Sequence, residues 1–173
     1  MVSPKLILGL IILLAVGGAA MLVAQWWIAG GIVLAIGIGL FYFWWRMNQL
    51  LQVTNALQRQ DWNDARKRLD AIRAPEKLNP YSKTYYYFFQ GIVETQGQNW
   101  KAARQGFKTA LDTGYFRSVD EKATALMYMA QLDMRGRNTE GARRYLREAR
   151  ELDPSDPIRE QINMIVKQSR IRL

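Results

Sequence analysis

The feature that most constrains this chain is a run of forty residues, 6–45, without a single Asp, Glu, Lys or Arg. Gln25 is its only strongly polar side chain. As one helix the run would be ~60 Å long, about twice the thickness of a bilayer's hydrocarbon core. We therefore predict that it turns at Gln25 and forms two membrane-spanning helices, residues 6–24 and 28–45, within a transmembrane hairpin of residues 1–46.

Charged side chains lie only at the ends of this predicted hairpin. Lys5 and Arg46 are both on the side opposite the turn, and the turn carries no charge. The positive-inside rule then places both termini in the cytoplasm, in a multi-pass protein of the inner (cytoplasmic) membrane. The alternative is a secretory signal peptide with a cleavage region at residues 17–20. Even in that case Arg46 would keep the C-terminal part in the cytoplasm.

The part of the chain after Trp45 is basic. It holds all 15 acidic and 23 of the 24 basic residues, so its net charge is +8. Such a surface suits an anionic partner, and the membrane tether favours anionic lipid over an acidic protein or nucleic acid.

Cys and His are absent, which excludes disulfides, thiolate metal sites and the commonest general base. We expect no enzyme activity, no cofactor and no metal, with Glu94 either solvated or paired to an arginine rather than acting as a general acid.

A helical pattern occurs three times at a nearly constant interval, beginning at Trp62, Trp100 and Thr139. The first residue of each set is large or polar. Three positions later comes a small residue, four positions after that a bulky one, and three positions after that a small or aliphatic one. The three sets are Trp62, Ala65, Leu69, Ile72; Trp100, Ala103, Phe107, Ala110; and Thr139, Ala142, Leu146, Ala149. Helical segments at residues 82–96 and 119–134 precede the second and third sets. Their predicted N-caps are Asn79, followed by a first-turn Pro80, and Ser118, and Gly114 is predicted to end the helix of the second set. This period is typical of stacked helical repeats.

Residues 137–154, RNTEGARRYLREARELDP, resemble the second helix and exit of a tetratricopeptide repeat (TPR). Gly91 and Ala130 fall where that family has a small residue in the first helix. The resemblance covers residues 47–154 as three repeats, and residues 155–173 would form a capping helix and tail. It implies an all-α fold, a short α-solenoid in a membrane-anchored protein of bacterial type. The residues expected to pack the repeats are Trp62, Ala65, Gly91, Trp100, Ala103, Phe107, Ala130, Ala142 and Leu146.

The aromatic run at residues 85–89 makes its helix apolar all round. The resemblance implies that part of this helix lines an exposed concave groove for an extended peptide or amphipathic helix. The groove residues would be Tyr85, Phe88, Ile92, Thr95, Gln96, Met127, Gln131, Met134 and Arg135. Alternatively, the membrane-proximal helix or the protein's own tail covers this surface.

A basic stripe on the last repeat, Arg143, Arg147 and Arg150, is predicted to contact anionic headgroups. Its alternative is a solvated surface with ordinary ion pairs.

Together these features predict a scaffold or adaptor that binds a protein client and assists the assembly of a membrane complex. A constitutive accessory subunit of a larger membrane assembly is the alternative, and nucleic-acid binding rests on charge alone. The sequence does not indicate an oligomeric state.

Overall fold

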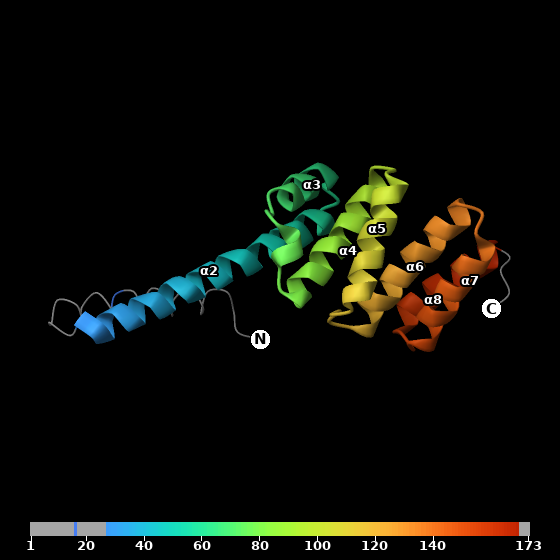
Figure 1. Ribbon diagram of the computed structural model, residues 1–173. Coiled ribbons are helices and arrows are strands. Elements are labelled where there is room, and N and C mark those ends of the chain that lie inside the picture. Colours follow the sequence, from blue (N-terminus) through green and yellow to red (C-terminus); the bar gives the residue numbers. More distant parts are fainter. Residues whose placement is uncertain (1–15, 17–26, 170–173) are drawn as a thin grey trace. The chain divides into compact units, whose positions relative to one another are not determined.

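The computed structural model describes residue 16 and residues 27–169, without the side chains of 27–30 and 40–49 (Figure 1). In this part of the chain the regular structure is entirely helical, which confirms the all-α prediction. The elements are α2 (Trp27–Gln58), α3 (Trp62–Asp70), the short 3-10 helix η1 (Pro75–Lys77), α4 (Pro80–Gln96), α5 (Trp100–Thr113), α6 (Val119–Arg135), α7 (Thr139–Glu151) and α8 (Asp156–Ser169).

Two compact units make up the chain, Met1–Leu51 and Gln52–Leu173, and α2 contributes residues to both. Apart from Val16, the first predicted span lies outside the described residues. The second, residues 28–45, falls within α2. Among the residues that the structure describes, none of the helices combines the length and the apolarity needed to cross a membrane. The hairpin therefore remains a prediction from the sequence.

The unit Gln52–Leu173 is built from helix pairs (Figure 1). Helix α4 packs against α5, α6 packs against α7, and α8 packs against both α6 and α7. The turn inside each pair repeats the same three backbone hydrogen bonds. In the α4–α5 turn, the amides of residues 97–99 donate to the carbonyl oxygens of Val93, Thr95 and Glu94. Residues 59–61 and 136–138 bond in the same way, so the recurrence in the sequence is also a repeat of backbone geometry.

Each of these turns contains one residue in the left-handed region, followed by the same kind of helix cap. Gln60, Gln98 and Arg137 have φ of 57°, 58° and 59°. The side chain of the next residue accepts a hydrogen bond from the amide three positions on, at 3.0, 3.4 and 3.1 Å. An Asp or Asn is favoured there because its short side chain reaches an amide that has no partner inside the helix. The three capping residues are Asp61, Asn99 and Asn138.

Two glycines allow α4 and α5 to approach closely. A Cβ on Gly106 would lie 2.8 Å from the Tyr87 carbonyl oxygen and 2.9 Å from the Gly91 nitrogen. A Cβ on Gly91 would lie 2.8 Å from the ring of Phe107. The two helix backbones therefore meet where neither carries a side chain, and the Phe107 ring occupies the space against Gly91.

Phe107 joins neighbouring repeats. Its side chain is fully buried. Its ring stacks on Tyr128 of α6 at 4.8 Å with an angle of 7°, and meets the Phe88 ring edge-on at 6.1 Å. Burial raises the pKa of Tyr128, since the ionised ring would lose its hydration. The other residues expected to pack the repeats are buried, except Trp62 and Trp100, which are half-buried.

Replacing Gly106 with Ala is expected to destabilise the chain by about 1–3 kcal/mol, because the added methyl group would overlap backbone atoms that cannot move independently. Thermal unfolding of the full chain in detergent measures the effect. Gly136→Ala is the matched control, because a Cβ there would make only ordinary contacts at 3.5 Å. An equal response of the two variants would contradict the close approach of α4 and α5.

The starts of α6 and α8 are joined by Asp120. Its carboxylate accepts hydrogen bonds from the Ser155 amide at 2.8 Å and the Ser155 hydroxyl at 2.7 Å. These two bonds lower the pKa of Asp120 below that of a free aspartate, because they stabilise the ionised form. At the α6 N-cap, Ser118 accepts from the Glu121 amide at 3.2 Å.

Asp120 should therefore stabilise the fold in a pH-dependent way. Its pKa is lowered on folding, so its contribution is complete above about pH 4 and is lost as the pH falls through the folded-state value. Asp120→Asn should lower the melting temperature near neutral pH, and the difference from wild type should shrink in acid. A difference that stays constant across this range would show that the carboxylate charge is not involved.

Candidate partner-binding surface

An arginine-to-carboxylate ion pair recurs where one repeat meets the next. Nη1 of Arg66 on α3 lies 3.2 Å from Glu94 on α4, and Nη1 of Arg104 on α5 lies 2.6 Å from Asp133 on α6. The second arginine and the second acid each stand one repeat after the first, so the pair belongs to the repeat. We refer to these contacts as the first and second junctions. The sequence had left Glu94 either solvated or paired to an arginine, and the structure pairs it with Arg66.

The carboxylate of the second junction is the more fully bonded. The Asp133 side chain is 3% exposed, and its second oxygen accepts from Asn138 Nδ2 at 3.2 Å. Gly141 leaves room for this oxygen, since a Cβ at that position would overlap it. Glu94 at the first junction is 13% exposed, and its Oε2 is buried without a hydrogen-bond partner among the described residues. Both junctions contain an arginine-to-carboxylate ion pair. Within the described residues, both oxygens of Asp133 have partners, whereas only one oxygen of Glu94 does.

A third arginine follows at the same register, Arg143 on α7. Its Nη1 binds Glu140 at 3.0 Å within the same helix. Its Nε is buried and has no partner in the described part of the chain. In the last repeat the arginine therefore pairs with an acid of its own helix, whereas Arg66 and Arg104 pair with an acid of the next helix. Of the predicted basic stripe, Arg143 is half-buried and Arg147 and Arg150 are exposed.

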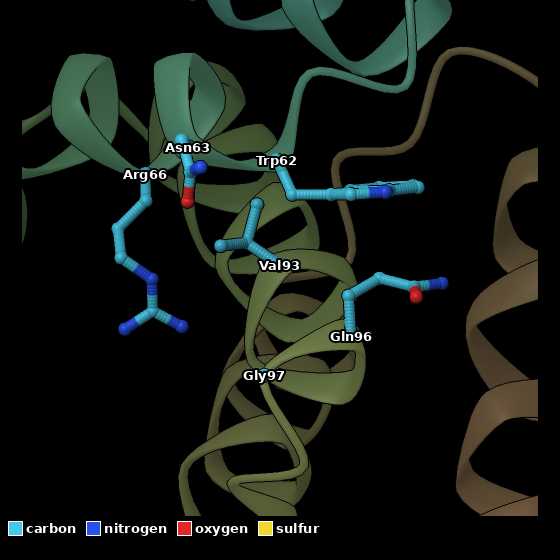
Figure 2. A pocket seen from close by; sticks show the side chains of 6 residues that line it. All are labelled: Trp62, Asn63, Arg66, Val93, Gln96 and Gly97. Atoms are coloured by element: carbon cyan, nitrogen blue, oxygen red, sulfur yellow. The ribbon is translucent and has the colours of Figure 1, made fainter.

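A pocket of about 200 Å³ lies between α3 and α4 at the first junction (Figure 2). The side chains of Trp62 and Gln96 extend in the same direction, and Val93 lies between the points where they leave their helices. At the second junction the equivalent tryptophan, Trp100, is covered by Arg135, whose guanidinium carbon is 3.9 Å from the ring centroid. The pocket is lined by Trp62, Asn63, Arg66, Val93, Gln96 and Gly97.

Three of the predicted groove residues do not lie on an exposed surface. Tyr85, Phe88 and Met127 are only 8%, 6% and 6% exposed. The Tyr85 hydroxyl donates to Glu121 and accepts from the Arg117 amide at 2.9 Å. Burial, together with the adjacent Glu121 carboxylate, raises the pKa of Tyr85. The expectation of apolar anchors open to a client is wrong at these positions.

Phe88 and Met127 are buried by their neighbours in the array. The ring of Phe88 meets Phe116 edge-on at 5.8 Å, and Phe116 belongs to the loop between α5 and α6. Met127 belongs to the core cluster that also contains Leu146 and Ile162. The loop and the last helix therefore cover side chains that the sequence had indicated as a binding face.

The other six predicted groove residues are at least partly exposed, and the most exposed of them are polar. Ile92, Thr95 and Met134 are half-buried, whereas Gln96, Gln131 and Arg135 are exposed. Thr95 Oγ1 donates to the Gly91 carbonyl oxygen at 2.7 Å and is thereby held against its own helix. Side chains that can reach a partner are thus mainly amides and a guanidinium. We call Gln96, Gln131 and Arg135 the polar edge.

The junction arginines are functional candidates that the sequence reasoning missed. Their signal was present, since Arg66, Arg104 and Arg143 each directly follow the small Ala of the repeat pattern. The first two are followed by an acid, Glu94 or Asp133, at nearly the same interval. In the described part of the chain, no group of three or more acidic side chains is placed to hold a metal ion.

Comparisons of the chain with protein-family models, with curated proteins and with solved structures found no match.

The Asp133 pair should be worth more than an exposed ion pair. Arg104→Ala leaves a buried carboxylate without its cation and is expected to cost about 2–3 kcal/mol, below the ~3–5 kcal/mol of a fully buried pair, because Arg104 is 41% exposed. Arg68→Ala removes the exposed pair with Asp64 and an exposed hydrogen bond to Gln52, and should cost at most about 1 kcal/mol. Urea unfolding midpoints of the full chain measure both. Equal losses would show that burial of Asp133 does not strengthen its dependence on Arg104.

Proposed function

We propose that this chain is a membrane-anchored scaffold of the TPR kind, which binds a protein client and assists the assembly of a membrane complex. The observation that carries the proposal is the polar edge. Gln96 and Arg135 hold the same register on α4 and α6, one repeat apart, and both are exposed. Gln131 lies one turn before Arg135. Stacked helix pairs repeat such positions along one side and so offer an extended binding surface.

The chemistry of the polar edge favours recognition by hydrogen bonds and charge. Amide side chains both donate and accept, and the Arg135 guanidinium is preorganised by its contact with Trp100. A client would therefore be recognised through its polar groups, with apolar contact limited to half-buried Ile92 and Met134. This is a different mode from the apolar groove expected from the sequence.

Membrane anchoring is the second part of the proposal. Its support is the uncharged run at residues 6–45, flanked by Lys5 and Arg46. In the proposed topology the repeats are cytoplasmic, and Arg147 and Arg150 are available to anionic headgroups. Each basic residue that approaches an anionic surface would contribute about 1 kcal/mol.

One observation favours the alternative, a permanent accessory subunit. Tyr81, Tyr115 and Val119 are 45%, 57% and 46% exposed. Tyr115 lies close to α4, since its amide donates to Thr84 Oγ1 at 3.2 Å. Exposed apolar side chains of this kind suit a constant protein neighbour better than a client that dissociates.

Site-specific photo-crosslinking in intact cells tests the client hypothesis. A photoreactive residue at Gln131 should give a discrete protein adduct, since the polar edge is expected to contact the client. The same residue at Gln105, exposed on α5, is the matched control and should give none. Arg135→Glu in the Gln131-labelled chain should abolish the adduct. Adducts of equal yield from both positions, or an adduct insensitive to Arg135, would contradict the proposal.

An adduct that forms from Tyr115 and not from Gln131 would support the accessory-subunit alternative. A client should dissociate during detergent purification, whereas a subunit should co-purify in fixed stoichiometry.

A further inference from the structure

The first and second junctions are built alike but are completed differently. At the second, the Arg135 guanidinium lies over the Trp100 ring, 3.9 Å from its centroid. At the first, Trp62 and Gln96 hold the equivalent positions, one repeat earlier. Gln96 is neutral, so the indole of Trp62 has an amide beside it where Trp100 has a cation (Figure 2).

The lining of the pocket at the first junction suits a planar, donor-rich group. Trp62 and Val93 give it apolar walls, and the side-chain carbonyl oxygens of Asn63 and Gln96 can accept hydrogen bonds. Its own cation, Arg66, is already paired with a carboxylate of α4. The indole face attracts a cation through its π electrons, and a planar guanidinium can stack on it.

The acid of the first junction also favours a cation over an anion. Glu94 uses Oε1 to bind Arg66, but its buried Oε2 has no donor among the described residues. At the second junction both oxygens of Asp133 are bonded, to Arg104 and Asn138. Within the described residues, the first junction thus holds a carboxylate that is less completely compensated than Asp133, and its tryptophan has no stacked arginine.

We propose that the Trp62 pocket binds the guanidinium of an arginine side chain supplied by a protein partner, which then does at the first junction what Arg135 does at the second. This inference rests on the proposed function and names what its client presents. The chain's own charge of +9 disfavours a strongly basic segment. The partner arginine is therefore expected in a neutral or acidic segment.

The test uses the full chain in detergent micelles with fluorine-labelled tryptophans, observed by fluorine NMR. The Trp62 signal is assigned with Trp62→Phe. The probe is N-acetylarginine amide, and N-acetylcitrulline amide is the neutral control of the same shape. The Trp62 signal should shift with an apparent dissociation constant about fivefold lower for the arginine probe, which corresponds to ~1 kcal/mol. The Trp100 signal should not move, because Arg135 already covers that ring.

Exchanging the residues beside the two tryptophans, Gln96 and Arg135, gives matched variants at exposed positions. Gln96→Arg should fill the pocket from within and abolish the response of Trp62. Arg135→Gln should uncover Trp100 and give it a response to the arginine probe. No shift of Trp62, an equal shift with the citrulline probe, or a response undiminished by Gln96→Arg would overturn the inference.

This test and the cross-linking test fail separately. A chain that forms the Gln131 adduct but ignores the arginine probe overturns the pocket inference and leaves the proposed function standing. A chain that binds the probe at Trp62 but forms no adduct overturns the proposed function and leaves the pocket as an arginine site.

Discussion

The array depends on the contact between α4 and α5, where Gly91 and Gly106 let two helix backbones meet. Phe107 packs against Gly91 and stacks on Tyr128 of the next repeat. One side chain therefore links three helices, and burying such a ring contributes about 1.5–3 kcal/mol. Because stacked repeats contact only their neighbours, a fault at this point would separate the helices before it from those after it.

The sequence predicted those parts of the fold that local chemistry determines. Asn79 followed by Pro80 gives a cap and a first-turn proline, and α4 begins at Pro80. Gly114 ends α5 with φ of 75°, a conformation that costs glycine little. Ser118 caps α6 as expected. In each case the deciding hydrogen bond joins residues three or four apart, so short patterns contain the necessary information.

The candidate site was predicted less well, because long-range contacts decide it. The aromatic run of α4, residues 85–89, covers all sides of the helix, and the sequence alone cannot say which side is covered. Tyr85 is covered through Glu121 of the next helix pair, and Phe88 through the loop residue Phe116. The ion pairs of Glu94 and Asp133 likewise join successive helix pairs. Of the predicted groove residues, those that these distant partners leave exposed, Gln96, Gln131 and Arg135, are polar.

The two junctions give the array a gradient of stability that bears on binding. The second has a doubly bonded carboxylate and a stacked arginine, whereas Glu94 has an oxygen without a hydrogen-bond partner among the described residues and Trp62 has the neutral Gln96 in the position of that arginine. Helix α3 is also the shortest α-helix in the described chain, with nine residues. A buried acceptor without a donor costs about 1–3 kcal/mol. The α3–α4 contact should therefore open first, and a ligand that binds only its closed form would stabilise it by mass action. The weakest junction is thus the one where a partner can add most to the order of the fold.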